Sequence, residues 1–266
     1  MNKKSGSKRQ RFPKSYTGKT LVIYLILRAL VILTLVMAAI RGNYENVLLC
    51  VLTLILFYVP DILQRSLDIH LPDTLEIIIL VFIFAAEILG EIQAFYIQIP
   101  IWDTMLHTTT GFLAAAVGFS LVDLLNRHER FSFEMSPVYM AIVAFCFSMT
   151  IGVLWEFFEF SADLFLHTDM QKDTILNGIS SVALNPEPVN VPIRIDHITS
   201  TVVNGETLPI RGYLDIGLFD TMKDLFVNFI GAVVFSVFGF FYAKHRGKKT
   251  TFVENLSPQP EEPEEE

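Results

Sequence analysis

Six apolar runs divide the chain, and each is long enough to cross a bilayer as a helix. About 20 mainly apolar residues suffice for a helical span. The runs are residues 20–40, 46–64, 75–97, 101–125, 137–165 and 219–243. Short polar segments separate them, apart from one long connection at residues 166–218. The pattern predicts an all-α integral membrane bundle of six transmembrane helices, within residues 20–243, and a small loop subdomain.

Lysine and arginine residues predict the direction of these spans. Residues 1–19 carry seven of them, and the segment KHRGKK after the last run carries four more. Positive charge beside a span tends to stay in the cytoplasm, and an even number of spans returns the chain to its starting side. We therefore expect a multi-pass protein of the cell membrane with both termini cytoplasmic, which makes residues 166–218 an extracytoplasmic loop.

The segments outside the runs differ in character. Residues 1–19 form a basic N-terminus, and residues 244–266 are basic and then acidic. The ending ENLSPQPEEPEEE combines proline with like charges, so we expect a disordered tail. In the extracytoplasmic loop, Asn204-Gly205 is the pair that a two-residue hairpin turn prefers. The sequence predicts a small outer hairpin there, which serves either as a plain connector or as a lid.

Composition supports the membrane assignment and narrows the chemistry. Hydrophobic residues make up 52% of the chain and mean hydropathy is +0.47, more than a soluble core of this length needs. Only Cys50 and Cys146 occur, both within apolar runs, which argues against a disulfide framework and a cysteine zinc site. We expect the lipid bilayer as a partner and no nucleic acid.

Ionisable and polar side chains interrupt four of the runs at helical spacing. They are Glu87 and Glu91, Asp103 and His107, Glu156, Glu159 and Asp163, and Asp220, Asp224 and Asn228. Residues three or four apart share one face of a helix, and the alternating span directions bring all four sets toward the outer side. Charged groups at membrane depth are costly and usually mark function, so we predict one shared site.

Carboxylates with a single histidine and no cysteine suit a divalent metal ion such as Mg²⁺, Mn²⁺, Ca²⁺ or Zn²⁺. The candidate metal ligands are Asp103, His107, Glu156, Glu159, Asp220 and Asp224. Of these, His107, Glu156 and Asp224 are also the candidate catalytic groups. Glu87 and Asn228 are expected to support the ligands or contact substrate. Among the protein's own cations, Lys223 is expected at the same membrane depth as these acids.

Two other interpretations of these acids remain open. Clustered carboxylates can share protons and form a relay, as they do in transporters. Alternatively, the acids near helix ends are simply hydrated, and Asp103 and Asp220 favour the helix dipole from first turns. Trp102 and Trp155 each precede an acid at the same level, which is where aromatic side chains anchor spans at the membrane surface.

Three motifs in order, WDTMLHTTTGFLAA, LWEFFEFSADLF and FDTMKDLFVNFIGA, resemble the YjdF-type family of bacterial inner-membrane proteins, over roughly residues 75–243. The resemblance implies an integral membrane protein of the cell envelope and supplies no reaction. It maps the family pattern onto Asp103, His107, Gly111, Phe112, Glu156, Glu159, Asp220, Thr221, Asp224, Gly231 and Ala232. The loop before Asp220 is longer here than in the family.

Three classes of function fit the sequence. The leading hypothesis is a metal-dependent enzyme that hydrolyses or transfers a phosphoryl or acyl group of a lipid-linked or envelope substrate. The second is an ion- or proton-coupled transporter, although the stretches GFLAAAVGFS and GAVVFSVFGFF beyond the acids offer an ion few ligands. The third is a membrane component that binds a partner through its outer loop. Substrate, metal and oligomeric state are left open.

Overall fold

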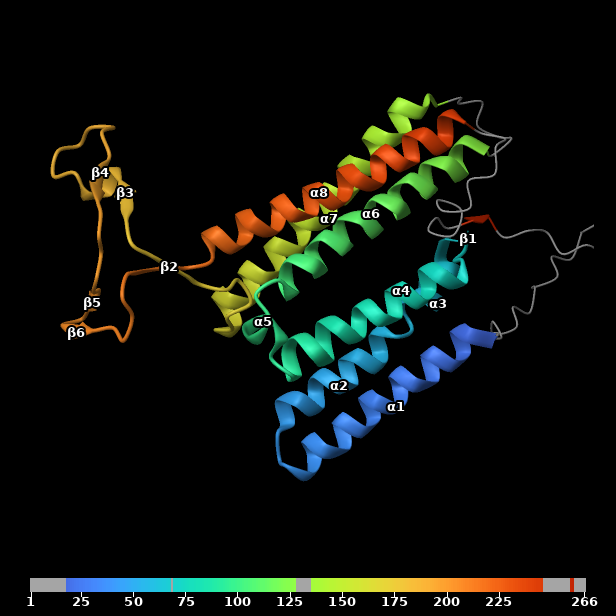
Figure 1. The fold of residues 1–266 in the computed structure, drawn as a ribbon, viewed down its shortest axis with the longest axis horizontal. Coiled ribbons are helices and arrows are strands. Elements are labelled where there is room, and N and C mark those ends of the chain that lie inside the picture. The colour runs from blue at the N-terminus through green and yellow to red at the C-terminus, as the bar shows by residue number, and fades with distance from the viewer. Residues whose placement is uncertain (1–17, 68, 128–134, 246–258, 261–266) are drawn as a thin grey trace, which may run out of the picture. The chain divides into compact units, whose positions relative to one another are not determined.

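The computed structural model describes residues 18–67, 69–127, 135–245 and 259–260 (Figure 1). The chain forms two compact units, divided between Trp102 and Asp103. The predicted basic N-terminus, except for Gly18 and Lys19, lies outside the described residues. So does the predicted acidic tail, apart from residues 244–245 and 259–260.

The first unit is built from helices and one short strand pair. Its elements are α1 (Gly18–Ile40), α2 (Tyr44–Leu56), α3 (Val59–Leu67), β1 (Ile69–His70), α4 (Asp73–Phe84), the π-helix η1 (Ala85–Ile92), α5 (Phe95–Gln98) and β8 (Gln259–Pro260). α1 packs against α2 and α4, around a core of Tyr24, Leu27, Val31, Cys50, Phe57, Leu80 and Ile88. The strand β1 pairs with β8 in antiparallel register.

Two interruptions in this unit have local causes. Between α2 and α3 the chain turns at Phe57 and Tyr58, just before Pro60. Proline has no backbone N–H and its ring clashes with the preceding helical turn, so it cannot continue a helix from α2. In η1 the hydrogen bonds widen to the π pattern, and Gln93 N donates to Ile88 O at 3.0 Å. A π-turn of this kind is a common feature of functional sites.

The second unit contains three long helices that carry the acids. They are α6 (Trp102–Arg127), α7 (Pro137–Leu166) and α8 (Leu218–Lys244). α7 packs along α8, and α6 meets α8 where two glycines face each other. A Cβ added to Gly111 would fall on the backbone oxygen of Asn228, and one added to Gly231 on that of Thr108. The missing side chains let the two backbones touch, as small residues do between membrane helices.

A hydrogen bond joins the third helix at the same level. Ser148 Oγ on α7 donates to the backbone oxygen of Gly111 on α6 at 2.7 Å. On the same face of α7, Gly152 leaves room for the side chain of Asn228 from α8. The three helices are therefore fixed against one another one to two turns below the acids, which gives the site a rigid base.

The connection between α7 and α8 consists of short antiparallel strand pairs. The strand β2 (Thr174–Leu176) pairs with β7 (Tyr213–Asp215), and β3 (Ile179–Ser181), which leads into the 3₁₀-helix η2 (Val182–Leu184), pairs with β4 (Ile193–Ile195). β5 (Val202–Val203) pairs with β6 (Glu206–Thr207). Between these two strands, Asn204 and Gly205 have φ values of 53° and 87°, the left-handed conformations of a type I′ hairpin turn.

The membrane fold class is confirmed, with one difference in the spans. Among the residues that the structure describes, five helical stretches are long and apolar enough to cross a membrane: Gly18–Ile40, Tyr44–Ser66, Trp102–Asp123, Pro137–Leu166 and Leu218–Lys244. The third predicted span, residues 75–97, is formed by α4 and η1, which continue without a break as helix from Asp73 to Ile92. Ala94, with φ of 57°, ends this helical path before α5, so the helix is shorter at its end than predicted.

Candidate functional site

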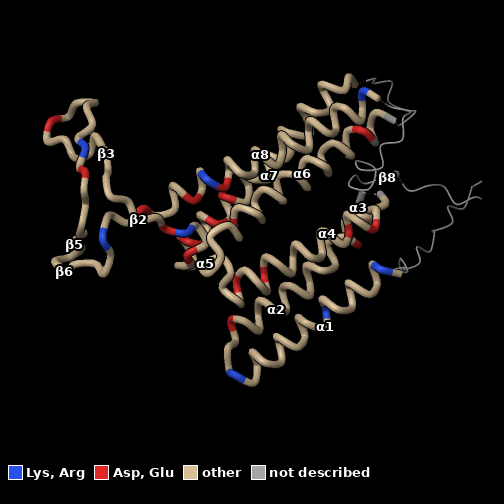
Figure 2. Tube along the Cα trace, viewed as in Figure 1, with Lys and Arg blue, Asp and Glu red and all other residues tan. Residues whose placement is uncertain are grey.

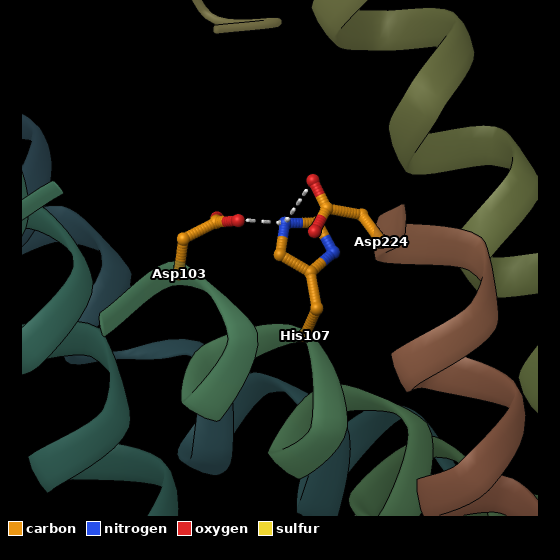
Figure 3. Close-up of side chains that lie close together, drawn as sticks. All are labelled: Asp103, His107 and Asp224. Carbon is orange, nitrogen blue, oxygen red and sulfur yellow. Dashed lines mark ion pairs between the residues drawn. The ribbon is translucent and has the colours of Figure 1, made fainter. Parts of the chain in front are cut away.

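The first pair of site residues comes from the start of α6. Asp103 and His107 are one turn apart, so both side chains lie on one face of the helix. His107 Nε2 lies 3.3 Å from Asp103 Oδ1, and the two side chains are 13% and 18% exposed. Figure 3 shows the carboxylate and the imidazole pointing toward each other above α6. Both side chains are therefore mostly buried but not fully enclosed.

A second carboxylate reaches the same imidazole nitrogen from α8. Asp224 Oδ2 lies 3.7 Å from His107 Nε2, and the Asp224 side chain is only 1% exposed (Figure 3). Asp103, His107 and Asp224 each offer one ligand atom within 4.8 Å of the others. Two oxygens from different helices thus converge on one nitrogen.

Lys223 joins the acids of α6 and α8. Its Nζ lies 2.8 Å from Asp103 Oδ2, 3.1 Å from Asp220 Oδ1 and 3.5 Å from Asp224 Oδ1. The lysine contacts Oδ2 of Asp103 and Oδ1 of Asp224, whereas His107 faces the other oxygen of each carboxylate. The ammonium group therefore holds both carboxylates without occupying the oxygens that face the imidazole.

The helix α7 adds two buried carboxylates on the other side of the imidazole. Glu156 Oε1 lies 4.0 Å from His107 Nδ1. His107, Glu156 and Glu159 form a second group whose ligand atoms lie within 4.8 Å of one another. Trp155 Nε1 donates to Glu159 Oε1 at 2.8 Å, which fixes the orientation of that carboxylate. The sequence predicted Trp155 as a membrane anchor and did not reveal this hydrogen bond.

Several buried oxygens of the cluster have no hydrogen-bond donor among the described residues. They are Oε2 of Glu156, Oδ1 of Asn228 and Oδ1 of Asp224, and the last of these has the Lys223 ammonium 3.5 Å away as an ion-pair partner. All three residues are at most 4% exposed. A buried acceptor left unpaired costs about 1–3 kcal/mol, more when it is charged. These oxygens therefore favour a bound donor or cation.

Residues 167–172 form a short strap after α7, at the end of the helix that carries the acids. Asp163 accepts hydrogen bonds from Thr168 Oγ1, Met170 N and Gln171 N, which folds the chain back over the helix end. The next amide, Lys172 N, donates to Asp220 Oδ2 at 2.8 Å. Asp163 thus organises a turn, and Asp220 is shared between the strap and Lys223. No motif in the sequence indicated these contacts.

Gln171 completes the strap from within. It is 8% exposed, and its side-chain amide donates to Thr221 Oγ1 on α8. Gly217, with φ of 86°, lies directly against Gln171, where a Cβ would clash. Just beyond the strap, burial and nearby carboxylates, including Asp169 and Asp215, raise the pKa of Asp173 above its usual value. The negative field of the cluster therefore extends into the strap.

Six of the predicted site residues thus lie together in the second unit. They are Asp103, His107, Glu156, Glu159, Asp220 and Asp224. Asn228 lies one turn further along α8, buried against Gly152, and donates to Met149 Sδ at 3.6 Å. Glu87 belongs to η1 in the first unit, so its expected role beside the cluster stays a prediction.

Negative groups outnumber positive groups in the cluster. The five carboxylates stand against one lysine and one histidine, so the formal sum is 1 − 5 = −4 with a neutral imidazole. Figure 2 shows acidic positions gathered where α6, α7 and α8 meet the connection between α7 and α8, with mostly tan segments along the middle of the three helices. Chemically, the arrangement can bind cations, hold a water molecule and exchange protons.

With the bundle and its acidic end described, the chain can be compared with known proteins. Its fold defines a multispanning membrane protein. It belongs to the DUF2238 family, described as predicted membrane proteins, whose profile matches residues 23–245. The expected membership of an uncharacterised membrane family is therefore confirmed.

A relative from Thermotoga maritima is named only as an uncharacterized protein. It is 25% identical over 107 residues, which cover 40% of this chain and 53% of the relative. The match thus spans about half the length of that protein. No solved structure matches the chain.

Proposed function

We propose that Asp103 Oδ1, His107 Nε2 and Asp224 Oδ2 bind a divalent cation. Ligands about 2.0–2.2 Å from a tetrahedral ion lie roughly 3.4 Å from one another. The distances from His107 Nε2 to the two oxygens, 3.3 and 3.7 Å, fit this spacing with little movement. This convergence of two carboxylates on one imidazole nitrogen is the observation that carries the proposal.

The surroundings of these three ligands support the proposal. Metal ligands are commonly held by further hydrogen bonds, and a histidine ligand usually donates its other ring N–H to a carboxylate or carbonyl. Glu156 stands on the Nδ1 side of His107, at 4.0 Å, and Lys223 holds the remaining oxygens of both aspartates. A modest approach of Glu156 would complete the second hydrogen bond.

The cation would serve as the Lewis acid of a membrane enzyme. Catalytic metal sites use three protein ligands and keep a position open for water or substrate. Here Asp224 is buried, while Asp103 and His107 are partly exposed and Lys223 is 44% exposed, so one side stays accessible. Met222 and Phe226, on the same helix, are 58% and 63% exposed, which suits a substrate anchored in lipid.

We therefore favour hydrolysis or transfer of a phosphoryl or acyl group on a lipid-linked or envelope substrate. In hydrolysis a cation held by Asp103, His107 and Asp224 would activate a water molecule, and Glu156 would take the proton directly, because His107 Nε2 would be occupied by the ion. The lysine and arginine bias of the sequence supports a location of this site at the outer face, with both termini in the cytoplasm.

A transporter fits the same cluster less well. An ion crossing the second unit would pass the level of Gly111 and Gly231, where the backbones of α6 and α8 touch. Beyond that level Phe235 is fully buried and its ring packs against Phe112 and Phe119. A site that is open at one end and packed at the other favours chemistry over transport.

The proposal is tested with purified full-length protein in proteoliposomes that contain phosphatidic acid, phosphatidylglycerol and a polyprenyl phosphate. Release of inorganic phosphate, fatty acid or glycerol is measured with Mn²⁺, Mg²⁺ or Zn²⁺ and with a chelator. We expect release from one substrate class, abolished by the chelator and reduced at least about 100-fold by Asp224→Asn. Glu206→Gln, an exposed acid on β6, is the control. Equal release from wild type and Asp224→Asn would contradict the proposal.

A further inference from the structure

The carboxylates on the Nδ1 side of His107 have no role as ligands of the ion proposed above. A neutral imidazole has one lone pair, so it ligates through one nitrogen and donates through the other. If Nε2 binds the first ion, Nδ1 carries the proton and faces Glu156 Oε1. Glu156 Oε2 is then the oxygen that remains, and it has no donor among the described residues.

Glu159 presents its free oxygen beside Glu156. The two glutamates are three positions apart on α7 and so share one face of that helix. Trp155 Nε1 occupies Oε1 of Glu159, which leaves Oε2 as the oxygen available to a ligand. Both side chains are buried, at 4% and 7% exposure. Glu159 thus has one oxygen held by a donor and one available, and Glu156 has Oε1 facing His107 Nδ1 at 4.0 Å and Oε2 available.

We propose that Glu156 and Glu159 bind a second divalent cation, so that the cluster is a two-metal site. This inference rests on the proposed function, because it adds an ion next to the one held by Asp103, His107 and Asp224. Mg²⁺ and Mn²⁺ are often bound through only one or two carboxylates, with water and substrate oxygens completing the shell. Glu156 is the link, with Oε1 toward His107 and Oε2 toward the second ion.

The charge of the cluster supports two ions and not one. With a neutral imidazole the five carboxylates and Lys223 sum to −4. One divalent cation leaves −2, and a second brings the cluster to zero. A cluster that kept a charge of −2 in a buried site would repel an anionic substrate, whereas a neutral pair of ions would accept one.

Two cations also narrow the substrate class. With both ions bound the cluster is formally neutral, so it can accept the negative charge of a phosphate ester. The exposed Lys223 ammonium stands at the open edge of the cluster, where a charged phosphate oxygen would approach.

The test counts metal ions in full-length protein held in lipid nanodiscs. The protein is stripped with a chelator, titrated with Mn²⁺, and its bound metal is measured by elemental analysis. We expect two ions per chain in wild type and in Glu206→Gln, and one in Glu159→Gln. Electron paramagnetic resonance should show dipolar spin coupling between two Mn²⁺ ions in one chain, which requires no variant.

A milder variant keeps the proposal testable if Glu159→Gln fails to fold. Trp155→Phe keeps every carboxylate and removes only the hydrogen bond to Glu159 Oε1, so we expect the second ion to bind about 10-fold more weakly and the first to bind as before. One ion per chain in wild type, without spin coupling, would overturn the second ion and leave the first intact. No bound ion would overturn both, and two ions retained at wild-type affinity in Glu159→Gln would overturn the assignment to Glu159.

Discussion

The ammonium group of Lys223 on α8 lies 2.8 Å from Asp103 Oδ2 on α6, across 120 positions of sequence. The same group lies 3.1 Å from Asp220 and 3.5 Å from Asp224. One lysine therefore partly neutralises three carboxylates and ties the beginnings of two helices together. Without it, the acids of α6 and α8 would repel one another.

Lys223→Met is expected to destabilise the metal-free protein. The loss should be about 1–3 kcal/mol, between the values for exposed and for buried ion pairs, because the lysine is partly exposed. A cation that binds only the folded state stabilises it, so Mn²⁺ should raise the melting temperature more in this variant than in wild type. Thermal unfolding in nanodiscs with Mn²⁺ or chelator measures both effects.

Lys172→Met is the matched control for that experiment. The Lys172 side chain pairs with exposed Asp169, while its contribution to the cluster is a backbone N–H that the substitution keeps. Its melting temperature should stay close to that of wild type. If the two lysine variants unfold alike in metal-free buffer, Lys223 does not hold the cluster together.

The contact between α6 and α8 makes Gly231 intolerant of a side chain. A methyl group there would meet the backbone of Thr108 and Phe112, which has no flexible side chain to move aside. We expect Gly231→Ala to cost about 1–3 kcal/mol or more, as overpacking does, and to weaken metal binding because the two helices must separate. Val237→Ala, at a half-exposed position on the same helix, is the control for the effect of any substitution in α8. Unfolding and Mn²⁺ affinity unchanged from wild type would show that the helices do not touch there.

Asp173 gives a prediction for the pH dependence of stability. Burial and the neighbouring carboxylates raise its pKa in the folded protein, so the folded state binds this proton more tightly than the unfolded state does. Stability from this group is therefore lost as pH rises through the acidic range into the neutral range. Asp173→Asn should raise the melting temperature at pH 7, and the gain should vanish in acid. A gain of equal size at every pH would point to a different cause.

Removal of the hairpin of β5 and β6 distinguishes the enzyme hypothesis from the hypothesis of partner binding. Replacing residues 202–207 with two glycines removes Asn204 and Gly205 but keeps Thr201 Oγ1, which donates to Gly212 O at 2.7 Å. We expect metal content and thermal unfolding of the helices to remain those of wild type. Loss of activity with full metal content would show that the outer segment binds a partner or covers the site.

Much of this arrangement could be predicted from the sequence because membrane physics is restrictive. Apolar runs of sufficient length indicated the helices, and acids at spacings of three and four indicated shared faces on α6, α7 and α8. The direction of each span then put those acids at one end. Asn204-Gly205 indicated its turn because both positions need positive φ.

Other features depend on contacts that no local pattern encodes. The sequence indicated Lys223 as a cation near the acids. Which oxygens of Asp103 and Asp224 it contacts depends on the register of α6 against α8. The π-turns of η1 and the positive φ of Ala94, which ends the helix before α5, could not be read from the apolar composition of the third predicted span. The strap at Gln171 depends on how Asp163 folds the chain after α7.

The binding of a cation by the His107 imidazole nitrogen is the claim that underlies the proposed chemistry. Nanodisc-held protein with one equivalent of Mn²⁺ can be examined by electron spin echo envelope modulation, which detects a nitrogen bonded to the ion. The account predicts a directly coordinated imidazole nitrogen in wild type and its loss in His107→Gln. Bound Mn²⁺ with no nitrogen coupling, or a coupling that persists in His107→Gln, would contradict it.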